Sequence, residues 1–87
     1  MLATRKVPGG KLLRLKAEIK LDKLVKPQLS GDFFLMPGEK LYELEHAMEG
    51  APIDGLADRL AAVIEQHGIT LVGITPADIE AAAKELK

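Results

Sequence analysis

In the stretch KLLRLKAEIKL, residues 11–21, nine successive residues alternate strictly between apolar and charged side chains. Side chains in a β-strand point alternately to the two faces of a sheet. This pattern therefore predicts a strand with one buried face and one solvated face. The four charged positions are Arg14, Lys16, Glu18 and Lys20. Because three of them are cations, the solvated face is expected to be basic.

Predicted strands on either side complete a small sheet. Upstream, residues 3–7 can pair with the alternating strand across a Pro-Gly-Gly turn at residues 8–10. Downstream, a short turn at residues 22–23 leads into a strand over residues 24–35. Pro27 in that strand cannot donate a ladder hydrogen bond, so the strand should lie at a sheet edge or carry a bulge. The sequence thus predicts a three-stranded antiparallel meander with the alternating strand in the middle.

The rest of the chain repeats its apolar residues with a helical period. Helices are predicted over residues 38–49, 54–67 and 76–86. Asp54 is expected to cap the second of them. The run TPAD at residues 75–78 supplies an N-cap threonine, a proline at the first helical position and an acid at the third, and should open the last helix.

Strands followed by helices predict an α+β fold, in which about three helices pack on one face of the three-stranded meander. Residues 1–87 are expected to form a single domain. The apolar run ITLVGI, residues 69–74, is either a fourth short strand or a buried connector. The expected core residues are Leu15, Ile19, Leu29, Phe33, Leu44, Leu60, Ile64 and Ile79.

Composition excludes several kinds of chemistry. The chain has no Cys, so disulfides, thiolate catalysis and cysteine-ligated metals are ruled out. Ser30 is its one serine, and nothing in the sequence ties either histidine to it. His46 lies among helix carboxylates and is expected to be solvated and ion-paired, while His67 should sit at a helix end. We therefore expect no catalytic, cofactor-binding or metal-binding residue.

The sequence also shows no targeting or membrane segment. No apolar run approaches the roughly 18–20 residues that a transmembrane helix requires. The N-terminus MLATRKVPGG lacks the apolar core of a secretory signal. A cytoplasmic protein is the expectation.

Charge is distributed unevenly along the chain. Residues 1–27 carry eight cations against two acids, a net charge of +6, and residues 28–87 carry four cations against eleven acids, a net charge of −7. Such asymmetry suggests that the basic half meets an acidic partner. Sheets that bind nucleic acid commonly add stacking aromatic side chains to such charge. Here only Phe34, at the border of the face, could serve, which argues against nucleic acid.

The segment LSGDFFLMPGE holds both phenylalanines of the chain, Phe33 and Phe34. In a regular strand they would point to opposite faces. Phe33 would then enter the core, while Phe34, in register with Lys26 and Asp32, would be a contact residue for a partner. The alternative is a bulge at Gly31 that turns both rings inward. Sequence alone leaves both arrangements open.

Three stretches of the chain resemble the accessory domain of lipoate–protein ligases. They are VPGGKLLRLKAEI, LSGDFFLMPGEKLYELEHAMEG and GITPADIEAAAKEL. The resemblance covers residues 5–86, and its most specific element is the GDFF run at residues 31–34, followed by a helix that begins with Pro and Glu. In the larger enzymes of this family the domain is a C-terminal segment. In some archaea and bacteria it is a separate small subunit.

The resemblance implies a function that the residue patterns do not reach. The complete ligase uses ATP and magnesium to activate lipoate to lipoyl-AMP, and then transfers the lipoyl group to a lysine of an acyl-carrier domain. The Arg-Arg/Gly-Gly-Gly type motif of the catalytic domain does not occur in this sequence. The resemblance therefore implies a non-catalytic accessory subunit, needed chiefly for activation, that binds no cofactor alone and forms a heterodimer with a catalytic subunit.

The expected interface with that subunit combines the basic sheet face with the exposed phenylalanine. Its residues are Arg14, Lys16, Lys20, Lys26, Asp32 and Phe34. Lipoyl-acceptor domains would be indirect partners, and no membrane or nucleic-acid partner is expected. The alternative function is a small module that binds RNA, another polyanion or another protein through the basic face.

Overall fold

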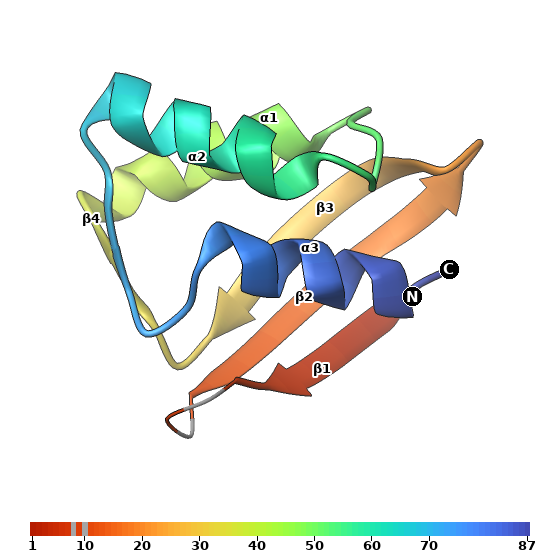
Figure 1. Cartoon of the computed structure of the whole chain (residues 1–87), viewed down its shortest axis with the longest axis horizontal. Coiled ribbons are helices and arrows are strands. Elements are labelled where there is room, and N and C mark those ends of the chain that lie inside the picture. The colour runs from red at the N-terminus through yellow and green to blue at the C-terminus, as the bar shows by residue number, and fades with distance from the viewer. Residues whose placement is uncertain (8, 10) are drawn as a thin grey trace.

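The structure is a computed structural model that describes residues 1–7, 9 and 11–87. Strands β1, β2 and β3 form an antiparallel meander, and β4 and β5 form a separate two-stranded antiparallel sheet (Figure 1). The predicted α+β fold is confirmed, with the second small sheet added to it. The elements are β1 (Leu2–Lys6), β2 (Leu12–Lys20), β3 (Lys23–Gly31), β4 (Phe34–Met36), the 3₁₀ helix η1 (Gly38–Lys40), α1 (Leu41–Met48), α2 (Leu56–His67), β5 (Thr70–Val72) and α3 (Pro76–Glu85).

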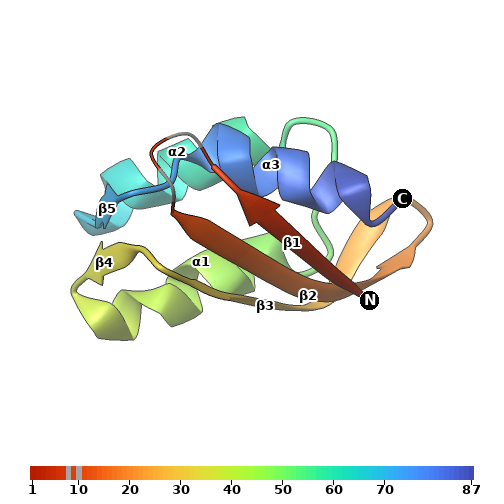
Figure 2. The ribbon, with the colours of Figure 1, turned by 90° about the horizontal axis from the view of Figure 1, so that it is seen from below.

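All three α-helices lie on the same side of the meander. Helix α3 crosses β1 and β2, α1 packs against β3, and α2 packs on both of the other helices. Figure 2 shows the sheet with its helices on one side, and no described element covers its other face. Both views place β4 at the end of the molecule opposite the two termini.

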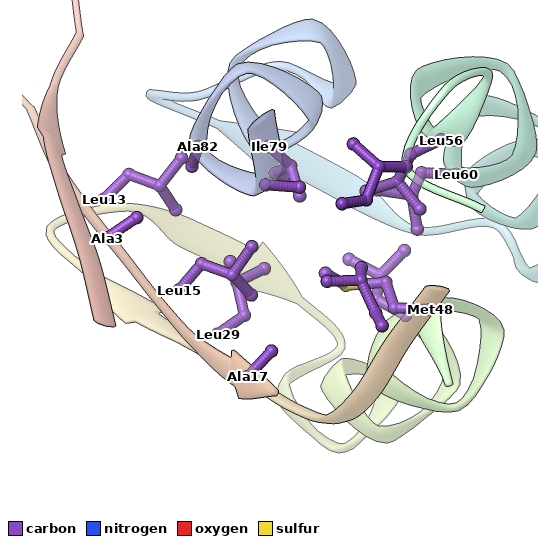
Figure 3. Close-up of a cluster of buried hydrophobic side chains, with 14 of the residues drawn as sticks. Ala3, Leu13, Leu15, Ala17, Leu29, Met48, Leu56, Leu60, Ile79 and Ala82 are labelled. Atoms are coloured by element: carbon purple, nitrogen blue, oxygen red, sulfur yellow. The ribbon is translucent and has the colours of Figure 1, made fainter. Parts of the chain in front are cut away.

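The core lies between the meander and the helices (Figure 3). Leu13, Leu15 and Ala17 point into it from β2, while the charged residues between them are exposed, as the alternation predicted. Five of the eight expected core residues are buried: Leu15, Leu29, Leu44, Leu60 and Ile79. The other three are partly buried and pack against the core from its margin: Ile19, Phe33 and Ile64.

Strand β3 lies at a sheet edge and also carries a bulge, whereas Pro27 predicted one or the other. Lys26 and Pro27 together stand opposite Ala17 of β2, and Lys26 has a φ of 54°. The extra residue changes which side chains point inward along the strand. Leu24 is therefore fully buried, whereas its neighbour Val25 is only partly covered.

The strand expected over residues 24–35 is broken at Gly31. Gly31 has a φ of 143°, and a Cβ at this position would collide with the carbonyl oxygen of Leu12. The Asp32 N–H donates to that same oxygen at 2.8 Å. The chain therefore leaves the meander at Gly31, and Phe34 begins β4 in the second sheet.

The connections also differ in detail from the sequence prediction. The turn expected at residues 22–23 is formed by Leu21 and Asp22, which have φ values of 52° and 61°. Part of the turn predicted at residues 8–10 lies outside the described residues, but Val7 N–H donates to Lys11 O at 2.9 Å. The run at residues 69–74 contains β5, so the strand alternative holds.

The N-termini of α2 and α3 are capped in different ways. Thr75 and Asp78 form the predicted capping box at α3. Asp54 does not cap α2, because the N-cap position is Gly55, with a φ of 86°. Instead Ala57 N–H donates to Glu80 Oε1 of α3 at 2.8 Å. This hydrogen bond, together with one from Lys84, holds the pKa of Glu80 below its ordinary value.

Candidate functional site

The open face of the meander is the first candidate docking surface. Directly opposite residues of antiparallel strands share a face. In this register Arg14 lies between Thr4 and Ser30, and Lys16 lies between Leu2 and Gln28. We call this surface the basic face; its charged residues, all exposed, are Lys6, Arg14, Lys16, Glu18, Lys20 and Lys23.

The cations of the basic face make no ion pairs with the described residues of the chain. Glu18, by contrast, lies 3.5 Å from the N-terminal amine. Arg5 does not belong to this face. Its guanidinium lies on the helix side, where Nη1 donates to Glu85 Oε2 at 2.9 Å.

The outer face of the β4–β5 sheet is the second candidate docking surface. Phe34 pairs with Val72 across the two strands, and Met36 lies two residues further along β4. These three side chains are 69%, 54% and 63% exposed, respectively. Leu35 and Leu71 point the other way and pack against the core. We call the three exposed residues the apolar patch.

The two phenylalanines point in opposite directions. Phe33 is partly buried against the core, and Phe34 is exposed. The alternative in which a bulge at Gly31 turns both rings inward is therefore wrong. Phe34 points outward as expected, but it does so as a residue of β4. The expected strand over residues 24–35 is not continuous, because β3 ends at Gly31.

The structure does not gather the six expected interface residues on one sheet. Arg14, Lys16 and Lys20 share the basic face, and Lys26 lies at the bulge on the rim of that sheet. Asp32 is exposed in the bend between β3 and β4, and Phe34 lies on the second sheet.

Four residues of the two surfaces were not predicted from the sequence. Lys6 and Lys23 complete the basic face through their cross-strand positions, and Met36 and Val72 complete the apolar patch. A local signal for the patch was present. In a strand over residues 34–36 or 70–72, the first and third side chains point to the same face. Their pairing with each other had no local signal.

A groove of about 540 Å³ lies between α1 and the bulge of β3, and its lining includes Tyr42 and three glutamates. Two of these carboxylates already bind backbone groups of the edge strand. Glu45 Oε2 accepts from Leu29 N–H at 2.8 Å, and Glu49 Oε1 accepts from Lys26 N–H at 2.9 Å. Unpaired N–H groups at a sheet edge invite pairing with another chain. The two carboxylates thus satisfy two N–H groups at the β3 edge.

The histidines do not form a metal site in the described part of the chain. His67, at the end of α2, has its Nε2 3.8 Å from Glu43 Oε2 of α1, and His46 is exposed. No three or more potential metal-ligating side chains converge among residues 1–7, 9 and 11–87. Within the same residues, no helix has the length and apolar character to cross a membrane.

No protein-family model and no curated protein is significantly similar to this chain. Among solved structures, its fold matches a chain from a structural analysis of an archaeal lipoylation system, a bi-partite lipoate protein ligase and its E2 lipoyl domain from Thermoplasma acidophilum. The TM-score is 0.80 and the sequence identity 24%, over 95% of this chain and 92% of that chain. At this identity the likeness shows a shared fold.

Proposed function

We propose that this chain is a non-catalytic accessory subunit of a bipartite lipoate–protein ligase. It associates with a separate catalytic chain, which holds lipoate, ATP and magnesium, and it is needed for activation of lipoate to lipoyl-AMP before transfer to an acceptor lysine. Two observations support the proposal: the fold shared with a chain of the archaeal lipoylation system, and the sequence resemblance over residues 5–86.

The chemistry of the chain is consistent with a role without catalysis of its own. It has no Cys, and its one serine, Ser30, stands beside Arg14 on the basic face. Nucleophilic catalysis by a serine needs a general base within hydrogen-bonding reach. Both histidines lie on helices, on the other side of the sheet.

The apolar patch is the observation that carries the proposed association. Phe34, Met36 and Val72 expose most of their surface side by side on a sheet of only two strands. A two-stranded sheet is marginally stable in water by itself, and contiguous exposed apolar side chains mark interaction surfaces. Aromatic residues and Met are enriched in the centres of protein interfaces. The patch therefore suits a permanent contact with the catalytic chain.

Substitution of Phe34 by Ala tests this assignment. A central aromatic anchor contributes about 2 kcal/mol or more to binding, which corresponds to roughly a 30-fold loss of affinity. We expect Phe34→Ala to weaken co-purification with the catalytic chain and to slow lipoyl-AMP formation. The kcat of transfer from preformed lipoyl-AMP should be unchanged, and this chain alone should make no lipoyl-AMP.

Tyr42→Ala is the matched control, because Tyr42 is also an exposed aromatic residue, at 76%, but lies on α1 beside the groove. It should bind the catalytic chain as the wild type does. If Phe34→Ala folds with an unchanged melting temperature and binds normally, Phe34 is not the anchor. If Phe34→Ala unfolds the isolated chain, the Phe34 ring stabilises the fold of this chain and is not shown to bind the partner.

A further inference from the structure

We propose that the basic face is a second, transient docking surface, which receives the acidic face of the protein that accepts the lipoyl group. This inference rests on the proposed function above. It assigns to the accessory chain a part in the transfer step, in addition to its part in activation.

The first argument is the concentration of charge. The basic face carries five exposed cations and one acid, while the whole chain has a net charge of −1. Two of these cations even face each other across neighbouring strands, since Lys20 of β2 stands directly opposite Lys23 of β3. Like charges directly opposite each other destabilise a sheet. A surface with this arrangement is suited to an acidic partner, which would relieve the repulsion.

The second argument is the contrast between the two surfaces. The centre of a permanent interface is depleted of charged residues and rich in apolar ones, as the apolar patch is. The basic face has Arg14 and Lys16 on its central strand. Exposed charges of this kind mainly raise the association rate and contribute little to residence time. An acceptor protein must arrive and leave in every turnover, whereas the catalytic chain stays bound.

The third argument separates a protein partner from a nucleic acid. The three aromatic residues of the chain are Phe33, Phe34 and Tyr42, and none lies in β1, β2 or β3. Single-stranded nucleic acids are held on sheets by base stacking as well as by charge. The basic face therefore offers electrostatic attraction without a stacking platform, which fits an acidic protein surface.

The test compares two double variants in the complete ligase. Arg14→Gln/Lys16→Gln removes two charges from the basic face. The control, Arg59→Gln/Lys87→Gln, removes two exposed charges from α2 and the C-terminus. Each variant is combined with the catalytic chain, and lipoyl transfer is measured against the concentration of the apo acceptor domain from the same organism. Lipoyl-AMP formation and heterodimer affinity are measured in parallel.

The expected result is a rise in the KM for the acceptor of about tenfold at low ionic strength for Arg14→Gln/Lys16→Gln, because charge steering of association has at least this magnitude. The kcat, lipoyl-AMP formation and heterodimer affinity should stay at wild-type values. The difference should shrink at about 0.5 M salt, where screening shortens the range of the charges. The control should match the wild type, and Lys20→Gln/Lys23→Gln should act in the same direction as the first variant.

Three results would overturn the inference. An unchanged KM in an active complex would exclude the basic face from acceptor binding. A loss of heterodimer affinity would place the basic face in the permanent interface. Tighter binding of a single-stranded RNA oligonucleotide than of the acceptor domain would make it a nucleic-acid surface. If the wild-type chain supports no lipoyl-AMP formation, the proposed function fails first, and this inference fails with it.

Discussion

At the scale of single residues, Gly31 controls the path of the chain between the two sheets. It pairs with Leu13 in the meander, and it has no room for a side chain beside the carbonyl oxygen of Leu12. Its φ of 143° is available to glycine and strained for other residues. These two properties let the chain bend at Asp32, so that Phe33 turns inward and Phe34 enters β4.

Gly31→Ala should therefore destabilise the protein strongly. Forcing a non-glycine residue into such a conformation costs about 1–3 kcal/mol, and the collision with Leu12 adds to it. The midpoint of urea denaturation is the measurement. Gly38→Ala is the matched control, because a Cβ at Gly38 would meet nothing within 4 Å. Equal midpoints for the two variants would contradict this account of Gly31.

At the scale of elements, α2 depends on α3 for the start of its helix. The first N–H groups of a helix have no partner within it. Gly55 has no side chain to offer them, and Glu80 Oε1 accepts from Ala57 N–H instead. Lys84, one turn further along α3, lies 3.2 Å from the other carboxylate oxygen of Glu80. Both neighbours favour the ionised carboxylate, so the pKa of Glu80 is lowered.

The lowered pKa of Glu80 gives a prediction about pH. Since the folded-state pKa lies below the unfolded one, the ionised group stabilises the fold fully above the unfolded pKa. This contribution is lost as the pH falls through the folded pKa. Glu80→Gln should thus lower the melting temperature at neutral pH, and the gap to the wild type should close in the acid range.

The control for this prediction is Glu65→Gln. Glu65 is an exposed carboxylate near the end of α2, for which the described residues form no ion pair. Its substitution should leave the melting temperature at neutral pH undiminished. A gap for Glu80→Gln that does not change with pH would show that its charge is not what stabilises α2.

At the scale of the whole molecule, covering one face of the meander leaves the other face open. Three helices bury Leu60, Ile79 and Met48 in a core that lies on one side of the sheet only (Figure 3). The same packing directs Arg14 and Lys16 toward solvent. The separation of a fully apolar core from a charged open face follows from the period-two pattern of β2.

Leu60→Ala should destabilise the whole molecule, because Leu60 is fully buried where α2 meets the core. Replacement of a fully buried Leu by Ala costs about 2–5 kcal/mol, including the cavity that is left. Ile64→Ala, one turn along α2, should cost less, since Ile64 is only partly buried at the margin of the core. Chemical denaturation measures both, and the opposite order would contradict the observed packing.

Features that depend on near neighbours in the chain were predictable. The alternation in residues 11–21 predicted β2, and a regular apolar period placed the three helices within a few residues of their observed bounds. Pro27 predicted an edge strand or a bulge, because proline lacks the N–H that a ladder hydrogen bond requires in any sheet. The capping box of Thr75 and Asp78 joins residues three apart. In each case the residues that matter lie close together in the sequence, within one strand or within one or two turns of a helix.

The sequence by itself therefore determined the number and kind of most elements, the buried side of β2 and the charge of its other side. Only the tertiary structure decided that Phe34 pairs with Val72, that Glu80 caps α2 and that the basic face and the apolar patch lie on different sheets. The physical reason is that alternation, helical period and capping are local, and their energies favour the same conformation wherever the segment lies. The pairing of β4 with β5 joins distant segments, so it depends on the rest of the fold to hold their backbones side by side.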